Sequence, residues 1–153
     1  MGKFRYRLQN ILNIRMKMED QARQNFSEAK IRLDEEETKL EIIRERKEDY
    51  ENRTRQMLMG SLNIRDIENG RNAVLVLEEQ LHTQQARVEQ ALRELEEARE
   101  RMKVAMQERK TQETLREKAF QEFLQEENRT ESKVIDELTS YTYGQKAGDG
   151  KNG

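Results

Sequence analysis

A seven-residue repeat of apolar residues dominates the middle of the chain. One line recurs at every seventh position, and a second follows members of the first by three residues: Ile67, Val74, Leu81, Val88, Leu95 and Met102, then Leu77, Ala91, Ala98 and Ala105. Alternating steps of three and four keep one narrow stripe of a helix facing a partner helix, whereas a strand would need alternation with period two. The pattern predicts a long helix in a coiled coil.

An earlier stretch shows the same helical spacing and predicts a first helix over about residues 3–59. Its apolar positions are Phe4, Leu8, Ile11, Leu12, Met18, Ala22, Phe26, Ala29, Leu33, Leu40, Ile43, Tyr50, Met57 and Leu58. Two successive steps of four over Met18–Phe26 indicate a stutter that moves the stripe sideways. Polar residues at or beside this seam cost stability but fix its register: Arg15, Asn25, Arg32 and Glu36.

The break between the helices is predicted at about residues 60–63. Gly60 suits the left-handed conformation that closes a helix, and Asn63 is a good N-cap for the next one. Leu62 and Ile67 match the two positions of a hydrophobic staple. A connection of roughly four residues forces the helices to be antiparallel neighbours.

The second helix is predicted over about residues 64–141, with a kink or a short separate turn at Gly70. If the turn centres near residue 61, the segment Phe120–Tyr143 projects beyond the first helix. Its charge is acidic on balance, and its apolar stripe is a docking surface or frays. Residues 144–153 contain four glycines and are interpreted as a disordered tail. The predicted fold is all-α: a long antiparallel two-helix coiled-coil hairpin over residues 1–143, with an overhanging C-terminal helix.

One local conflict concerns Arg109 and Arg116, which continue the seven-residue line opposite the basic beginning of the first helix. Charges of one sign should not share a seam. We expect the seam to move to the neighbouring line of Leu92, Met106 and Phe120 rather than the helices to splay.

Composition limits the function. Charged residues make up 39% of the chain, hydrophobic residues 33%, and the net charge is −2. These values are typical of long helices and exclude both a thick globular core and a field that favours nucleic acid. Cysteine is absent, and no apolar run suits a membrane span or a signal peptide. We therefore expect a cytosolic protein without nucleic acid as partner and without direct membrane insertion.

Catalytic, metal and cofactor sites are not expected. His82 is the single histidine, so a zinc site would lack ligands, and we interpret it as a polar residue beside the seam. The phosphate-cradling pattern of a P-loop does not occur. The methionines are better explained as adaptable packing than as a copper or redox site.

The two ends of the chain and its glycine-containing break carry a family resemblance. From about Phe4 to Leu138 the chain resembles the flagellar export proteins of the FliJ family, through three features: the run Phe4–Arg15, the break near residue 60, and Glu127-Asn128-Arg129 followed by Lys133 and Asp136-Glu137. The resemblance implies an antiparallel two-helix coiled coil, similar to the central stalk subunit of rotary ATPases. It implies a non-enzymatic role in flagellar type III export, at the cytoplasmic side of the inner membrane.

The same resemblance implies three partners: the hexameric flagellar export ATPase, the transmembrane export gate protein and the flagellar export chaperones. Carried over by position, the ATPase contact would involve Phe4, Leu8, Gln9, Ile11, Leu12, Arg129, Lys133 and Asp136. The gate contact would involve Leu77 and Leu81, with Ala73 where relatives have an aromatic residue.

Two alternatives stay open at the level of sequence. A generic structural coiled coil could self-assemble through the same stripes. A rotary-ATPase central stalk subunit is disfavoured, because such subunits usually carry extra segments between the helices and four residues leave no room for them. The short turn and the matching stripes predict a monomer on its own.

Overall fold

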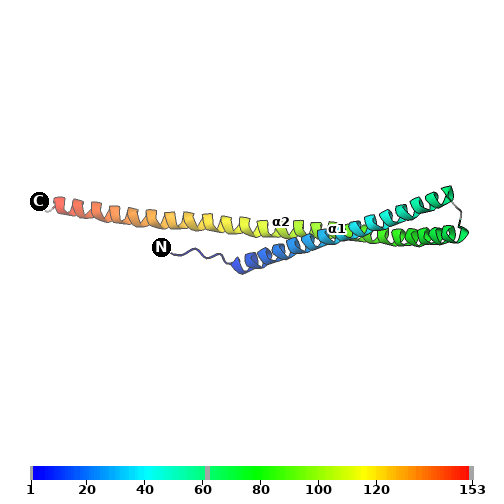
Figure 1. The fold of residues 1–153 in the computed structure, drawn as a ribbon. Coiled ribbons are helices and arrows are strands. Elements are labelled where there is room, and N and C mark those ends of the chain that lie inside the picture. Colours follow the sequence, from blue (N-terminus) through cyan, green and yellow to red (C-terminus); the bar gives the residue numbers. More distant parts are fainter. Residues whose placement is uncertain (1, 61–62, 152–153) are drawn as a thin grey trace. The chain divides into compact units, whose positions relative to one another are not determined.

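Two long helices form the protein. The computed structural model describes the backbone of residues 2–60 and 63–151 and the side chains as far as Gln145. Helix α1 spans Gln9–Met59 and helix α2 spans Ile64–Lys151, and the described residues contain no strand (Figure 1). The predicted all-α, two-helix hairpin is confirmed.

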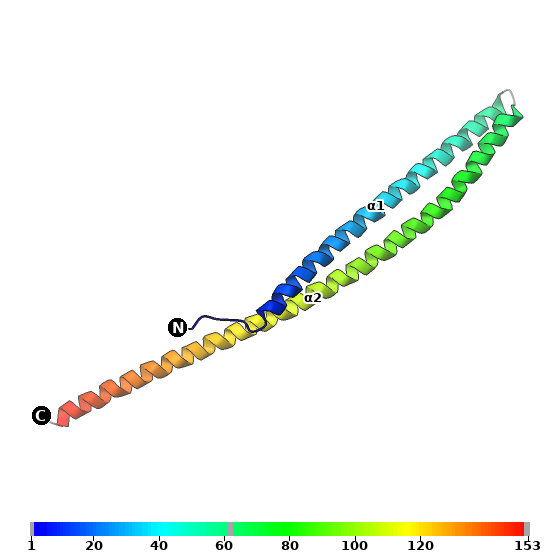
Figure 2. The same cartoon turned by 90° about the horizontal axis from the view of Figure 1, so that it is seen from below.

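Both helices run through two compact units, Met1–Lys17 with Met106–Gly153, and Met18–Ala105. In the Met18–Ala105 unit the helices lie side by side in both views (Figure 1, Figure 2). Ion pairs show that they are antiparallel, because Arg32 contacts Glu94 at 3.0 Å while Lys47 contacts Glu78 at 3.7 Å. In the other unit, α2 continues far beyond the first residue of α1.

The seam of α2 follows the seven-residue line that the sequence predicts. Within the Met18–Ala105 unit, every member of the two apolar lines is buried or half-buried. The tightest cluster there joins Leu33 of α1 to Ala91 and Leu95 of α2, with Phe26, Ala29 and Val88 against it. Burial of an apolar stripe from each helix is what holds this unit together.

The seam of α1 differs from the prediction. Glu19 is 6% exposed and Met18 is 49% exposed, so the carboxylate residue occupies the seam and the methionine does not. The residues of α1 that face α2 are then spaced by regular steps of three and four: Glu19, Ala22, Phe26, Ala29, Leu33, Glu36, Leu40, Ile43 and Lys47. The predicted stutter is wrong, because it was built on apolar residues alone.

The N-terminal residues are not helical, so the predicted start of α1 near residue 3 is wrong. The backbone N–H of Gln9 donates to the carbonyl of Tyr6 at 3.1 Å, and the helix begins there. Before it, Phe4 and Tyr6 are half-buried while the basic residues between and around them are exposed. This alternation has period two, which fits an extended segment rather than a helix.

The turn is only partly as predicted. The Asn63 side chain caps α2, because its Oδ1 accepts a hydrogen bond from the Arg65 N–H at 3.1 Å. Gly60 does not have a positive φ, so its predicted left-handed conformation is wrong. Its N–H instead donates to the Met57 carbonyl at 3.4 Å. Leu62 of the predicted staple lies outside the described residues.

Gly70 lies inside an uninterrupted helix, so the short separate turn predicted there as one alternative is wrong. A Cβ atom at this position would lie 2.9 Å from Oγ1 of Thr54 on α1. Close contact between the two helices therefore explains the glycine.

The helix α2 ends at Lys151 rather than near Tyr141. None of its described glycines has a positive φ, so the glycine-containing segment is helical in the structure. Each glycine costs a helix about 1 kcal/mol relative to alanine. The disorder expected for residues 144–153 in solution stays a prediction.

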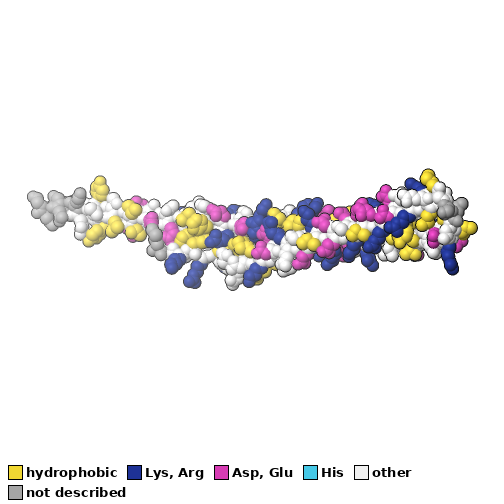
Figure 3. Space-filling view, viewed as in Figure 1, with side chains coloured by type: hydrophobic (Ala, Val, Ile, Leu, Met, Phe, Trp, Pro, Cys, Tyr) yellow, Lys and Arg dark blue, Asp and Glu magenta, His cyan; other side chains and the backbone are white. Residues whose placement is uncertain are grey.

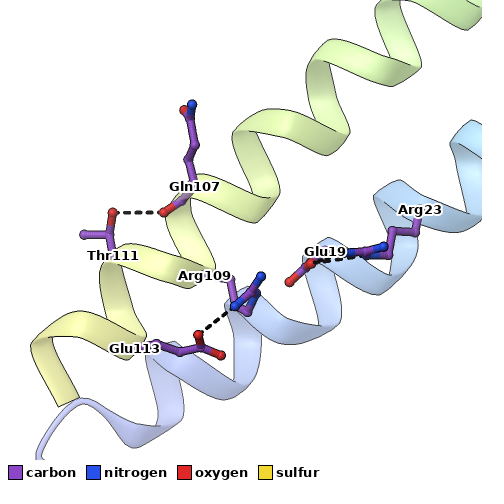
Figure 4. Close-up of polar contacts among 6 residues, drawn as sticks. All are labelled: Glu19, Arg23, Gln107, Arg109, Thr111 and Glu113. Atoms are coloured by element: carbon purple, nitrogen blue, oxygen red, sulfur yellow. Dashed lines mark hydrogen bonds and ion pairs between the residues drawn. The ribbon is translucent and has the colours of Figure 1, made fainter. Parts of the chain in front are cut away.

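Arg109 stays close to the seam instead of giving way to the neighbouring line. Leu92 is 49% exposed, so the predicted shift of the seam to its line is wrong at that residue, although Met106 and Phe120 are half-buried. The Arg109 guanidinium contacts the Glu113 carboxylate at 2.6 Å, as Figure 4 shows. Arg109 is thus balanced by Glu113, and Arg15 at the start of α1 is balanced by Glu108.

Candidate functional site

The N-terminal segment and the α2 surface beneath it form the most detailed set of contacts in the unit that holds both ends of the chain. We call residues 2–8 the N-terminal strap. The Phe4 ring lies 5.2 Å from the Phe120 ring, nearly edge-on at 69°, and 5.5 Å from the Phe123 ring. The Arg116 guanidinium carbon lies 5.6 Å from the centre of the same ring. Phe4 is therefore enclosed by two aromatic rings and one cation.

Polar contacts extend the attachment toward α1. The Tyr6 hydroxyl donates to Oε1 of Gln112 at 3.1 Å, and Nε of Arg116 donates to Oε1 of Gln9 at 3.0 Å. About two turns further along, Arg15 contacts Glu108 at 2.7 Å. These contacts fix the start of α1 against α2 in an antiparallel register.

The apolar residues near the start of α1 that are predicted to contact the ATPase fall into two groups. Leu8 and Ile11 are exposed, so both are available to a partner. Leu12 is 2% exposed and belongs to the seam. Substitution of Leu12 would therefore report on folding rather than on a contact with another protein.

The candidates near the end of α2 lie beyond the strap. From Asn128 to Gln145 every side chain is exposed. Arg129 contacts only Glu126, at 4.0 Å, among the described residues, and Lys133 and Asp136 have no ion pair among them. Spacings of four and three place these three residues on one face of the helix. Among the described residues they form no hydrogen bond or ion pair with the strap, so the predicted ATPase-binding set forms two neighbouring surfaces rather than one cluster.

Large apolar side chains accompany these charges on the same part of α2. They are exposed along its last described turns (Figure 3): Val134, Ile135, Leu138, Tyr141 and Tyr143. We call Asn128–Tyr143 the overhang. An exposed apolar stripe of this length on a helix without an intramolecular partner is typical of a surface that binds another protein.

Comparison with known proteins assigns the chain to a family. It matches the family described as flagellar FliJ protein over residues 4–148, which is nearly its whole length. The chain belongs to the flagellar FliJ protein family. No curated protein matches it. Among solved structures, that of a candidate YscO homologue from Chlamydia trachomatis is 23% identical, with a TM-score of 0.62, and the match covers 92% of this chain and 96% of the other. That likeness supports the fold.

Family membership makes the chain a component of flagellar protein export, as the resemblance of its two ends predicts. Among the described residues, neither helix has an apolar stretch that could cross a membrane. The same residues contain no group of three histidine, cysteine or acidic side chains placed to hold a metal ion.

The residues predicted to contact the export gate lie in the seam of this FliJ family member. Leu77 is buried and Leu81 is half-buried, so neither presents its side chain to a partner while the helices stay packed. Their neighbours Leu75 and Val76 are exposed. The heptad pattern could have identified these two, because they are apolar residues outside the repeat.

The pattern of apolar residues also missed a polar pair inside the seam. Gln84 is buried, at the one position where the second apolar line has a gap, and its side-chain amide donates to both the carbonyl and the carboxylate of Glu36. This hydrogen bond lowers the pKa of the Glu36 carboxyl, and the charge of Lys39 acts in the same direction while burial opposes it. The gap at Gln84 was the signal for this pair.

Proposed function

We propose that the chain is a non-enzymatic stalk of the flagellar export apparatus, which binds the hexameric export ATPase and promotes its assembly and activity. The observation that carries the proposal is the overhang: exposed apolar residues beyond the last contact of α2 with the strap. Its apolar area has no function in stabilising the hairpin, since its side chains are exposed throughout the part of the chain that the structure describes. A stalk that inserts into a ring needs an unpaired end of this kind.

The charge of residues 122–137 also supports the C-terminal part of α2 as the contact with the ATPase. Residues 122–137 contain six acidic side chains and two basic ones, Arg129 and Lys133. Glu122 with Glu126, and Glu127 with Glu131, are like-charge pairs four residues apart, which are unfavourable on an isolated helix. A partner with a basic, apolar surface would offset that cost. Leu8 and Ile11 add exposed apolar side chains at the start of α1.

The other proposed contacts use different surfaces. We propose that Leu75 and Val76, rather than the buried Leu77, face the transmembrane export gate, and that flagellar export chaperones bind the same protein. These contacts would keep the chain at the cytoplasmic side of the flagellar base, as a peripheral component. Family membership favours this function over a generic structural coiled coil.

The test is stimulation of ATP hydrolysis by the cognate export ATPase. Replacement of Val134, Leu138 and Tyr141 by Ser in the full-length chain should reduce stimulation by about ten-fold, because loss of central apolar anchors dominates interface energies. Leu92→Ser is the control, since Leu92 is an exposed apolar residue of α2 outside the overhang. Full stimulation by the triple variant, at unchanged helicity, would contradict the proposed site.

A further inference from the structure

We propose that the surface of α2 under the N-terminal strap is a binding site for an extended protein segment that carries an aromatic residue between basic ones, and that the strap occupies this site in cis. The site consists of Gln112, Arg116, Phe120 and Phe123. This inference concerns a surface distinct from the overhang, and it does not rest on the identity of the ATPase.

The contacts of the strap define the chemistry of the ligand. One aromatic ring is enclosed by Phe120, Phe123 and the Arg116 guanidinium. A second aromatic residue, two positions later, donates a hydroxyl hydrogen bond to Gln112. A spacing of two places both side chains on one face of an extended backbone. The site thus selects an extended segment with aromatic residues at alternate positions.

Charge complementarity indicates that the ligand of this site also carries basic residues. The strap carries Lys3, Arg5 and Arg7 and no acid. Residues 112–127 of α2 carry five acidic side chains and two basic ones, Arg116 and Lys118. The three basic residues of the strap are exposed and form no ion pair among the described residues, so they act through the general field rather than through fixed pairs. Such attraction weakens as salt is added.

The strap is also suited to release. It lies outside α1, and its side chains hold it by the contacts of the single Phe4 ring with Phe120, Phe123 and Arg116 and by one hydroxyl hydrogen bond. Segments with few buried contacts open before the rest of a protein does. A partner segment of the same chemistry would compete for the site, and its apparent affinity would be reduced by the fraction of time that the strap occupies it.

The experiment uses the full-length chain and a fluorescent peptide with the sequence of residues 2–8. Phe4→Ala should vacate the site, so this variant should bind the peptide about ten-fold more tightly than the wild type. Ile14→Ala is the matched control, because Ile14 is an exposed apolar residue of the same unit outside the site, and it should bind like the wild type. Binding to Phe4→Ala should weaken with salt and be lost when the peptide has alanine in place of its phenylalanine.

A second variant keeps the inference falsifiable. It is a triple variant that combines Phe4→Ala with Phe120→Leu and Phe123→Leu. The two leucines preserve an apolar surface but remove the aromatic rings, so this variant should lose the gain in affinity. Equal binding by the wild type and Phe4→Ala would overturn the inference, and so would undiminished binding by the triple variant. A wild-type chain that dimerises while Phe4→Ala stays monomeric would also overturn it, since the strap of a second copy would then be the occupant.

Discussion

Single polar side chains occupy seam positions where apolar residues are expected. Glu19, Glu36 and Gln84 each face the partner helix within the Met18–Ala105 unit. Each costs some stability compared with an apolar residue, but a polar residue in a seam opposes any shift in register, because a shift would leave it unpaired. The contact between Gln84 and Glu36 is the clearest case, since it joins a side-chain amide to both a backbone carbonyl and a carboxylate.

The Gln84–Glu36 pair predicts a dependence of stability on pH. The pKa of the Glu36 carboxyl is lower in the folded chain than in the unfolded chain, chiefly because Gln84 donates to it. The ionised carboxylate therefore stabilises the fold above its unfolded pKa, and this contribution disappears as the pH falls through the folded value.

Gln84→Leu should remove that contribution, so its melting temperature should fall less between pH 7 and strongly acidic pH than that of the wild type. At pH 7 two effects oppose each other, because leucine fills the gap in the apolar line but leaves the Glu36 carboxylate without the Gln84 donor. Thermal unfolding followed by circular dichroism at both pH values measures the two effects. Parallel losses in the two proteins would contradict the assignment of the pKa shift to Gln84.

The effect of Gly70→Ala on the free energy of unfolding depends on the neighbouring Thr54. Alanine in a helix is favoured over glycine by about 1 kcal/mol, but a new Cβ would lie 2.9 Å from Oγ1 of Thr54. That hydroxyl donates to the Tyr50 carbonyl at 2.8 Å, so it cannot rotate away without loss of the hydrogen bond. Overpacking costs about 1–3 kcal/mol, and Gly70→Ala should therefore be destabilising by roughly 1 kcal/mol.

The same substitution made in a Thr54→Ala background should instead be stabilising by about 1 kcal/mol, since only the helix propensity remains. Urea unfolding of the four proteins of this cycle measures the difference. A stabilising effect of Gly70→Ala in both backgrounds would contradict the close contact between the helices at this position.

At the scale of elements, apolar periodicity predicted both helices, the short connection predicted their antiparallel pairing, and their unequal lengths predicted the overhang. It failed where polar residues decide the structure. Glu19 replaces Met18 in the seam, and a search restricted to apolar residues could not detect this. The strap was missed because Phe4 and Leu8 have a helical spacing, while the alternation of Phe4 and Tyr6 with basic residues indicates an extended segment.

The candidate site was predictable only in part. The overhang followed from helix lengths alone, and residues 128–143 are exposed as expected. The predicted segment Phe120–Tyr143 begins too early, because Phe120 and Phe123 are half-buried against Phe4. The family resemblance implied that Leu12 and Leu77 contact a partner, but both are buried in the seam. Periodicity already placed Leu77 in the seam, so the physical pattern was the better guide to which side chains can reach a partner. The contacts of Phe4 with α2 depend on tertiary structure that no sequence pattern specifies.

At the scale of the whole molecule, the remaining issue is whether exposed apolar residues cause self-association. The overhang exposes apolar side chains, and residues 122–137, which lead into it and overlap its first half, carry six acids against two bases. Pairing of two copies along residues 122–137 would bring like charges together, which is unfavourable until salt screens them. The acidic charge of residues 122–137 thus keeps the chain free for a partner of different composition.

We therefore expect a monomer of 18.3 kDa by light scattering at low ionic strength, independent of protein concentration. At about 1 M salt the Debye length falls to about 3 Å, and weak dimerisation should then appear at high concentration. Glu131→Lys with Asp136→Lys should make dimerisation detectable at low salt, because each copy would then offer both signs of charge. The matched control, Glu96→Lys with Glu97→Lys, changes the net charge equally but lies outside the overhang, and should stay monomeric. A stable dimer of the wild type at low salt would show that the hairpin needs a second copy to cover its apolar stripe.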